Sequence, residues 1–265
     1  MTFELGPALL FCPADRSDRY AKALDRADAV ILDLEDAVAP SARTAARAAL
    51  AATPLDPARV IVRVNPPSTP DFAPDLDAVR AAGYDTVMVA KADAAMPPLP
   101  GLRVVALCET AGGVVDAPAL ARRDEVVALM WGAEDLVASL GGTSSRDASG
   151  RYRDVVRTAR SQVLLAARAA GMAAIDAVHL AIADLDGLRD EAEDAVASGF
   201  TATACIHPSH VPVIRAAYRP SEEQLARARR ILDAAATQAG VFRLDDQMVD
   251  GPVLRHAEAV LRRAT

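Results

Sequence analysis

The chain has 265 residues, of which 52% are hydrophobic and only 4% aromatic, so an aliphatic, alanine-rich core is expected. The formal net charge is −7, and the absence of a dense lysine and arginine run argues against a nucleic-acid partner. The three cysteines are far apart, no apolar stretch approaches about 18 residues, and the N-terminus does not resemble a secretory signal. We therefore expect free thiols, no membrane span and a reducing, cytoplasmic location.

Short apolar runs recur along the chain and predict β-strands. They do not alternate polar with apolar residues, so both faces are expected to be buried, as in parallel strands. Each has the length of a strand and is rich in valine, isoleucine or leucine. The runs are Leu9–Pro13, Ala29–Leu34, Val60–Val64, Thr86–Ala90, Arg103–Leu107, Val126–Trp131, Ala173–Val178 and Thr203–Ile206.

Segments with helical periodicity separate these runs. The clearest are Asp18–Arg26, Ser41–Ala51, Asp75–Ala82, Asp154–Ala170 and Leu185–Ala197, with Ser41 and Asp75 as predicted N-caps. Eight strand–helix units with right-handed crossovers predict an α/β fold, a (β/α)₈ TIM barrel. A doubly wound open sheet is the alternative.

The pattern changes after the eighth run. Ser221–Gln238 predicts a long amphipathic helix, Gly240–Pro252 is rich in turn residues, and Val253–Arg263 predicts a last helix. The sequence therefore predicts a barrel domain over residues 1–220 and a C-terminal helical extension over residues 221–265. We expect the extension to contact a neighbouring subunit.

Charged residues follow most of the predicted strands, where a barrel carries its catalytic groups. Glu109 and Asp135 follow neighbouring strands, and no cysteine or histidine group has zinc spacing, so the pair suits Mg²⁺. Alternatively, Asp135 caps the helix after it. Arg63 is placed to hold an anion or an enolate oxygen, and Lys91 a phosphate or carboxylate. For both, a structural ion pair is the alternative, and the expected partner of Arg63 is Asp33 or Glu35.

Other chemistries have less support. His179 and His207 also follow strands, but we interpret them as structural or supporting residues rather than bases. The chain contains no P-loop, GxGxxG or GxSxG motif, so nucleotide hydrolysis, NAD binding and a serine nucleophile are not indicated.

At these positions the chain resembles the citrate lyase β-subunit-like branch of the HpcH/HpaI aldolase superfamily over nearly its whole length. Eight ordered motifs carry the resemblance, and together they are far more specific than any one alone. They are LFCPADR (Leu10–Arg16), AVILDLEDAVAP (Ala29–Pro40), VRVN (Val62–Asn65), ALCETAGGV (Ala106–Val114), WGAEDLVASLGG (Trp131–Gly142), AVHL (Ala177–Leu180), CIHPSHV (Cys205–Val211) and QMVDGPV (Gln247–Val253).

The resemblance implies a Mg²⁺-binding TIM barrel that assembles as a homotrimer or hexamer. Glu109 and Asp135 match the metal ligands, and Arg63 matches the arginine that holds the reacting oxygen. Arg16 and Lys91 fall where the family meets the acyl-CoA, and Glu109 also faces the substrate. Asp250 matches an acid that, in related lyases, reaches the neighbouring subunit's site, which makes it the candidate acid/base.

Three positions depart from the family pattern. Gly112 stands where many relatives have arginine, Arg43 where they often have lysine, and Ala90 where proline is frequent. These changes leave the metal ligands in place and bear on substrate identity.

The implied function is a Mg²⁺-dependent lyase that cleaves or forms a small β-hydroxy acyl-CoA by retro-Claisen chemistry. The products of cleavage are acetyl-CoA and a keto acid, and the candidate substrates are malyl-CoA, citramalyl-CoA and 3-hydroxy-3-methylglutaryl-CoA. The alternatives are a metal-dependent aldolase of free 2-keto acids, the β subunit of a citrate lyase complex acting on a carrier-protein thioester, or a non-catalytic barrel.

Overall fold

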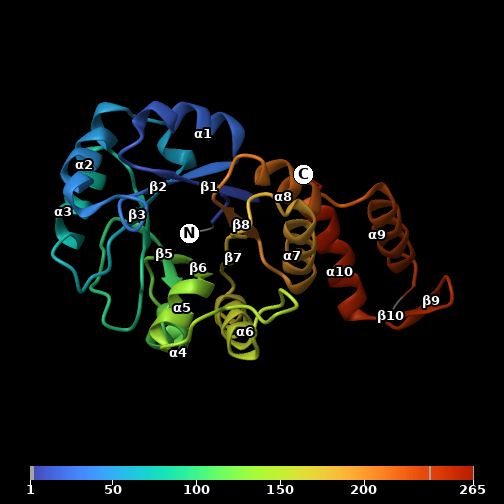
Figure 1. Ribbon diagram of the computed structural model, residues 1–265. Coiled ribbons are helices and arrows are strands. Elements are labelled where there is room, and N and C mark those ends of the chain that lie inside the picture. The colour runs from blue at the N-terminus through green and yellow to red at the C-terminus, as the bar shows by residue number, and fades with distance from the viewer. Residues whose placement is uncertain (1–2, 239, 265) are drawn as a thin grey trace. The chain divides into compact units, whose positions relative to one another are not determined.

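The computed structural model describes residues 3–238 and 240–264, and its centre is a closed barrel of eight parallel strands (Figure 1). Each strand pairs with the next in sequence, and β8 closes the ring on β1. The TIM-barrel prediction is therefore confirmed. The strands are β1 (Ala8–Pro13), β2 (Ala29–Asp33), β3 (Val60–Val64), β4 (Thr86–Val89), β5 (Arg103–Cys108), β6 (Val126–Trp131), β7 (Ala173–Asp176) and β8 (Ala202–Cys205).

An α-helix follows every barrel strand except β4, which joins β5 through the helix-free segment 90–102. The helices are α1 (Tyr20–Arg26), α2 (Arg43–Ala52), α3 (Phe72–Ala81), α4 (Ala111–Leu120), α5 (Ala133–Ser139), α6 (Asp154–Ala169), α7 (Leu185–Ser198) and α8 (His210–Tyr218). Short 3₁₀ helices lie at η1 (Ser17–Arg19), η2 (Pro40–Ala42) and η3 (Pro57–Arg59).

The two predicted N-caps were wrong. Ser41 lies inside η2, and the residue before α2 is Ala42. Asp75 lies within α3 and is fully buried, where it accepts hydrogen bonds from both nitrogens of Asn65 and forms an ion pair with Arg47. An aspartate that resembles a cap in sequence thus fastens α3 to the end of β3.

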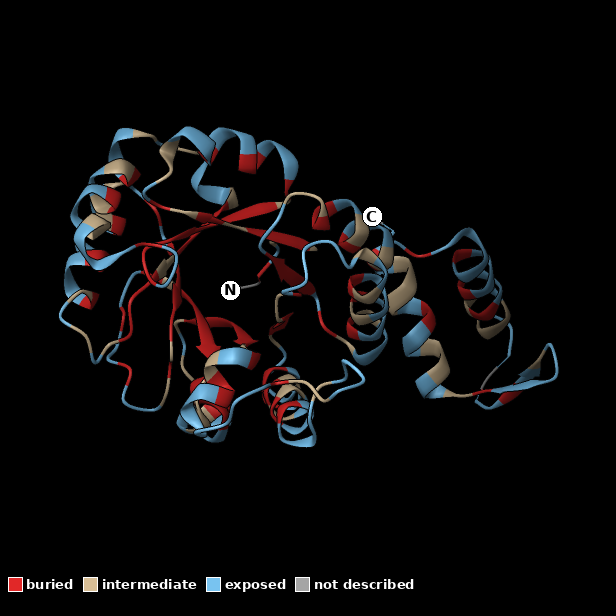
Figure 2. Ribbon diagram, in the orientation of Figure 1, coloured by how far each residue is buried: buried red, intermediate tan, exposed pale blue. Residues whose placement is uncertain are grey.

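Alternate residues of the strands fill the barrel with aliphatic side chains. Leu9, Ile31, Ile61, Met88 and Ile175 belong to one buried cluster, although they come from five different strands. Figure 2 shows the buried strands, ringed by helices whose outward faces are exposed. Because the barrel is filled, its chemistry is confined to the strand ends.

The chain divides into two compact units, Met1–Ile214 and Arg215–Thr265. The second unit contains α9 (Glu222–Ala235), a hairpin of β9 (Phe242–Leu244) and β10 (Gln247–Val249), and α10 (Gly251–Arg262). Ser221 begins α9 with a capping box completed by Gln224. The predicted domain boundary after residue 220 stays a prediction.

Two expectations from composition can be compared with the structure. Cys12, Cys108 and Cys205 are buried thiols that form no disulfide, as predicted. Within the described residues, no helix is long and apolar enough to cross a membrane.

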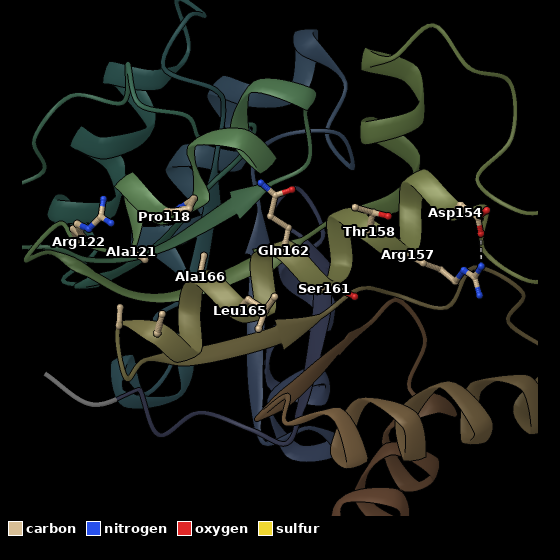
Figure 3. Close-up of a pocket in the computed structure, with 12 residues that line it drawn as sticks. Pro118, Ala121, Arg122, Asp154, Arg157, Thr158, Ser161, Gln162, Leu165 and Ala166 are labelled. Atoms are coloured by element: carbon tan, nitrogen blue, oxygen red, sulfur yellow. Dashed lines mark hydrogen bonds and ion pairs between the residues drawn. The ribbon is translucent and has the colours of Figure 1, made fainter.

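A groove of about 960 Å³ runs between α4 and α6 (Figure 3). Pro118 and Ala121 line it from α4, and Gln162 and Leu165 from α6. None of the charged residues that were predicted to do chemistry lines this groove.

Candidate functional site

Charged side chains continue the inward-facing rows of the barrel core. On β2, Asp33 follows the core residue Ile31 at the next alternate position, and after β5 Glu109 follows Leu107 in the same way. Arg63 has the equivalent place on β3 and is paired in register with Asp33. Successive side chains of a strand point to opposite faces, so these three residues form a polar layer above the aliphatic core.

Arg63 is bound to two buried carboxylates. Its Nε and Nη2 donate to the two oxygens of Asp33 at 2.7 and 2.6 Å, and its Nη1 lies 2.9 Å from Glu35 Oε2. The ring of Phe11 lies 4.9 Å from its guanidinium carbon. The ion pair predicted as an alternative is present, and it holds the guanidinium in one orientation.

Lys91 contacts four acids that follow three different strands, β2, β5 and β6. Its Nζ lies 2.5 Å from Glu35, 3.1 Å from Asp135, 3.8 Å from Glu109 and 3.9 Å from Asp36. Burial by itself lowers the pKa of Lys91, but the bond to Glu35 and the charge of Glu109 raise it overall. The ammonium is therefore a firmly protonated member of the site.

Glu109 is almost completely buried. Burial, aided by the charge of Asp135, raises the pKa of Glu109 to about 8. Its Oε1 accepts a hydrogen bond from the Lys91 backbone at 3.1 Å. A Cβ at Gly132 would lie 2.9 Å from both Cβ and Oε2 of Glu109, so glycine is needed there for the glutamate to fit.

We name six residues the acidic cluster. They are Asp33, Glu35, Arg63, Lys91, Glu109 and Asp135. Asp36 is exposed and is left out of the cluster. Four carboxylates then face two cationic side chains, so with all groups ionised the cluster has two excess negative charges.

The acidic cluster fits a divalent cation. The excess charge is that of one such ion, and carboxylate oxygens are the donors that Mg²⁺ prefers. In the described part of the chain, no three His, Cys, Asp or Glu side chains gather as a metal site. Mg²⁺ held by Glu109 and Asp135 would thus take water and substrate oxygens as its other ligands.

Two predicted site residues lie elsewhere. Arg16 follows β1, and its partly exposed guanidinium forms an ion pair with Asp18 at 3.0 Å. Among the described residues, Arg16 makes no contact with the acidic cluster. Asp250 belongs to the second unit, where its carboxylate caps α10 by accepting a hydrogen bond from the backbone N–H of Val253 at 3.3 Å.

Asp135 was also considered as a helix cap. It lies in the first turn of α5, whose N-cap is Gly132, so it is not the cap of that helix.

A second charged network lies after β7, and we name it the histidine network: Arg146, His179, Asp184 and Glu191. His179 is buried, with Nδ1 2.8 Å from Glu191 and Nε2 3.4 Å from Asp184. Arg146 contacts Glu191 at 2.6 Å. The bond to Glu191 raises the pKa of His179. Two acids here face one arginine and one histidine that can be charged.

Sequence reasoning predicted Asp33 or Glu35 as an ion-pair partner of Arg63, and both form that pair. It did not predict that Glu35 also contacts Lys91 and so joins the two cationic side chains. It missed Gly132, which makes room for Glu109. The role of Gly132 depends on packing between strands, which the sequence pattern does not show.

Comparisons with known proteins identify the family of the chain. The sequence model of the HpcH/HpaI aldolase/citrate lyase family matches residues 8–96 and 100–208. A citrate lyase subunit beta-like protein from Mycobacterium tuberculosis is 57% identical over 261 residues, covering 98% of this chain and 96% of that protein. A (3S)-malyl-CoA thioesterase from Cereibacter sphaeroides is 32% identical over 270 residues, covering 97% of this chain and 92% of that protein.

A solved structure extends the likeness to three dimensions. CitE from M. tuberculosis, crystallised with magnesium, acetoacetate and coenzyme A, is similar with a TM-score of 0.94. The two are 56% identical, and the alignment covers 98% of each chain. Fold, motifs and comparisons agree: the chain belongs to the HpcH/HpaI aldolase/citrate lyase family.

Proposed function

We propose that this protein is a Mg²⁺-dependent carbon–carbon lyase that cleaves or forms a small β-hydroxy acyl-CoA, with acetyl-CoA and a keto acid on the cleaved side. The observation that carries the proposal is the pair Glu109 and Asp135, which share Lys91 beside Arg63 at the strand ends. The complex of M. tuberculosis CitE with magnesium, acetoacetate and coenzyme A supports the choice of metal and thioester.

The proposed residues divide the chemistry between them. When bound by Glu109 and Asp135, Mg²⁺ acts as a Lewis acid toward the oxygens of the keto-acid portion. As the β-hydroxyl loses its proton and the Cα–Cβ bond breaks, the electron pair stays on the acyl-CoA carbon as an enolate. Arg63 stabilises that negative charge from the orientation set by Asp33 and Glu35. Asp250 gives the enolate carbon its proton and is reprotonated, through solvent, by the proton that the β-hydroxyl released, so the step balances. Arg16 and Lys91 contact the acyl-CoA.

The first experiment measures acetyl-CoA release from malyl-CoA, citramalyl-CoA and 3-hydroxy-3-methylglutaryl-CoA, with Mg²⁺ and with EDTA. Release that needs Mg²⁺ and is lost in Glu109→Ala supports the proposal. The matched control is Glu125→Gln, which alters a glutamate paired with Arg123 just before β6, at the opposite end of the strand. Release that is independent of metal contradicts the proposal.

The same assay separates the alternatives. Release of free CoA without acetyl-CoA would indicate thioester hydrolysis, the activity in the name of the C. sphaeroides relative. Turnover of free hydroxy keto acids, with none of the thioesters, would indicate an aldolase. Turnover only of a carrier-protein thioester would indicate the β subunit of a citrate lyase complex.

Assembly as a homotrimer or hexamer belongs to the same proposal, with Asp250 acting in its own or a neighbouring subunit. Asp250→Asn should abolish most turnover, and normal turnover would remove Asp250 from the mechanism. Mixing inactive Asp250→Asn with inactive Glu109→Ala distinguishes the two arrangements. Recovered activity requires Asp250 of one subunit to serve Glu109 of another, whereas no recovery places both residues in one chain. Analytical ultracentrifugation gives the subunit number.

A further inference from the structure

Lysine is rare in this protein, and one of its two lysines lies in the acidic cluster. Among 29 basic residues, only Lys22 and Lys91 are lysines. Lys22 is exposed on α1, whereas the Lys91 ammonium lies within 4 Å of four carboxylates. Two of those four, Glu109 and Asp135, are the proposed metal ligands.

The backbone holds Lys91 in this place. Its φ is +51°, in the left-handed region that residues other than glycine rarely adopt. Its N–H donates to Glu109, and the next N–H, of Ala92, donates to Leu107 at 3.0 Å. The carbonyl of Ala92 in turn approaches Gly113 so closely that a Cβ there would lie 2.4 Å away. Hydrogen bonds from the backbone N–H groups of Lys91 and Ala92, and the close packing of Ala92 against Gly113, hold this strained conformation. The fold therefore fixes the backbone from which the Lys91 ammonium reaches the acids.

Glu109 and Asp135 cannot bind Mg²⁺ and the Lys91 ammonium at the same time. Mg²⁺ requires oxygens at about 2.0–2.1 Å in octahedral geometry and retains several waters. An ammonium 3.1 Å from Asp135 and 3.8 Å from Glu109 occupies the same region and repels the incoming charge. The shortest contact of Lys91 is with Glu35, which is not a proposed metal ligand.

We propose that Lys91 is an internal counter-cation that competes with the metal for Glu109 and Asp135 and withdraws onto Glu35 when the metal binds. This inference rests on the proposed metal site and adds a control on its affinity. The ammonium offsets the repulsion between buried acids and weakens metal binding, so the metal is exchangeable. Lys91 that has moved to Glu35 and Asp36 stays at the edge of the cluster, where it can meet an anionic part of the substrate.

The first test compares Mg²⁺ affinity in wild type and Lys91→Met by calorimetry, at an alkaline pH where affinity no longer changes with pH. Lys91→Met is expected to bind Mg²⁺ about tenfold more tightly, because one competing charge is gone. The control Lys22→Met is expected to match wild type. Equal or weaker binding by Lys91→Met would overturn the inference.

The second test follows the ammonium itself in unmutated protein. Protein labelled with ¹³C and ¹⁵N in lysine gives two side-chain signals, and Lys91→Met assigns them. During a Mg²⁺ titration the Lys91 signal is expected to shift in step with the calorimetric saturation, while that of Lys22 stays in place. A stationary Lys91 signal at saturating Mg²⁺ overturns the inference but leaves the metal site intact. Absence of Mg²⁺ binding in wild type overturns the metal site and the inference with it.

Discussion

The acidic cluster and the histidine network are both partly buried charged groups at the ends of barrel strands, but they differ in charge balance. The acidic cluster has four carboxylates for two cations, whereas the histidine network has two acids, Glu191 and Asp184, for Arg146 and His179. A balanced buried network stabilises the fold. A network with excess buried charge costs stability unless something neutralises it, so imbalance marks the region built to bind a cation.

Among the substitutions that test this comparison, Glu109→Gln should have the largest effect on activity. Losing one of two protein ligands should reduce Mg²⁺-dependent turnover by about 10³-fold, at the upper end of what one electrostatic group contributes. The variant should unfold at no lower temperature than wild type. Activity and thermal unfolding measured together at pH 9 provide the check. A strongly destabilised variant would contradict the claim that the acidic cluster, unlike the histidine network, does not stabilise the fold.

Arg63→Lys should reduce both activity and stability. Lysine keeps the charge but cannot donate to both oxygens of Asp33, so turnover should fall by about 10²-fold. Buried Asp33 and Glu35 then lack part of their partner, at a cost of about 1–3 kcal/mol in unfolding free energy. Steady-state kinetics and urea unfolding measure the two losses. Wild-type turnover in this variant would exclude a special role for the guanidinium fork.

Metal affinity should depend on pH through Glu109. Its pKa is raised to about 8, so below pH 8 the folded protein holds a proton that Mg²⁺ must displace. Affinity should therefore rise about tenfold per pH unit below pH 8 and level off above it. The same raised pKa means that stability contributed by this group falls as pH rises from its ordinary value near 4.5 toward 8. Calorimetry from pH 6 to 9 tests the slope, which Glu109→Gln should abolish.

The barrel could be predicted from the sequence because its strands are continuous apolar runs. Each of the eight predicted runs overlaps one strand, and Val60–Val64 and Val126–Trp131 agree at both ends. Helices α4 and α8 were not predicted. Helix α4 contains Pro118 and two glycines, so it shows no clear helical period.

The site was only partly predictable, for a physical reason. Position after a strand places Arg63, Lys91, Glu109 and Asp135 in one region, but spacing does not say which side chains touch. The contacts of Glu35 with both Arg63 and Lys91 depend on loops that are 28 or more residues apart. The role proposed for Asp250 stays a prediction, since its contact in the structure is the cap of α10.

His179→Leu should do the opposite of Glu109→Gln. The bond to Glu191 raises the pKa of His179, so its stabilisation is full below its ordinary pKa of 6.5 and is lost as pH rises through the raised value. The substitution should therefore lower the unfolding free energy by about 1–2 kcal/mol at pH 6 and by less at pH 9. Chemical unfolding at both pH values gives the difference, and calorimetry should find wild-type Mg²⁺ affinity. A weakened metal site would mean that the two networks are coupled.

Gly112→Arg should have the smallest effect on the fold. Gly112 is exposed in the first turn of α4, and an added Cβ would meet only Thr110 Oγ1, at 3.9 Å. Replacing a helical glycine gains about 0.5–1 kcal/mol, and a positive charge at a helix N-terminus offsets part of this gain. The unfolding free energy should thus change by less than about 0.5 kcal/mol.

Because the chain resembles relatives that have arginine at this position, the added guanidinium should alter KM across the acyl-CoA panel while kcat for the best substrate is retained. Gly112→Ala is the control, since it changes helix propensity without adding charge. If Gly112→Ala and Gly112→Arg shift KM equally, the effect belongs to the backbone, and residue 112 does not help to select the substrate. If only the arginine shifts KM, substrate choice is separable from the acidic cluster, which Gly112 does not contact.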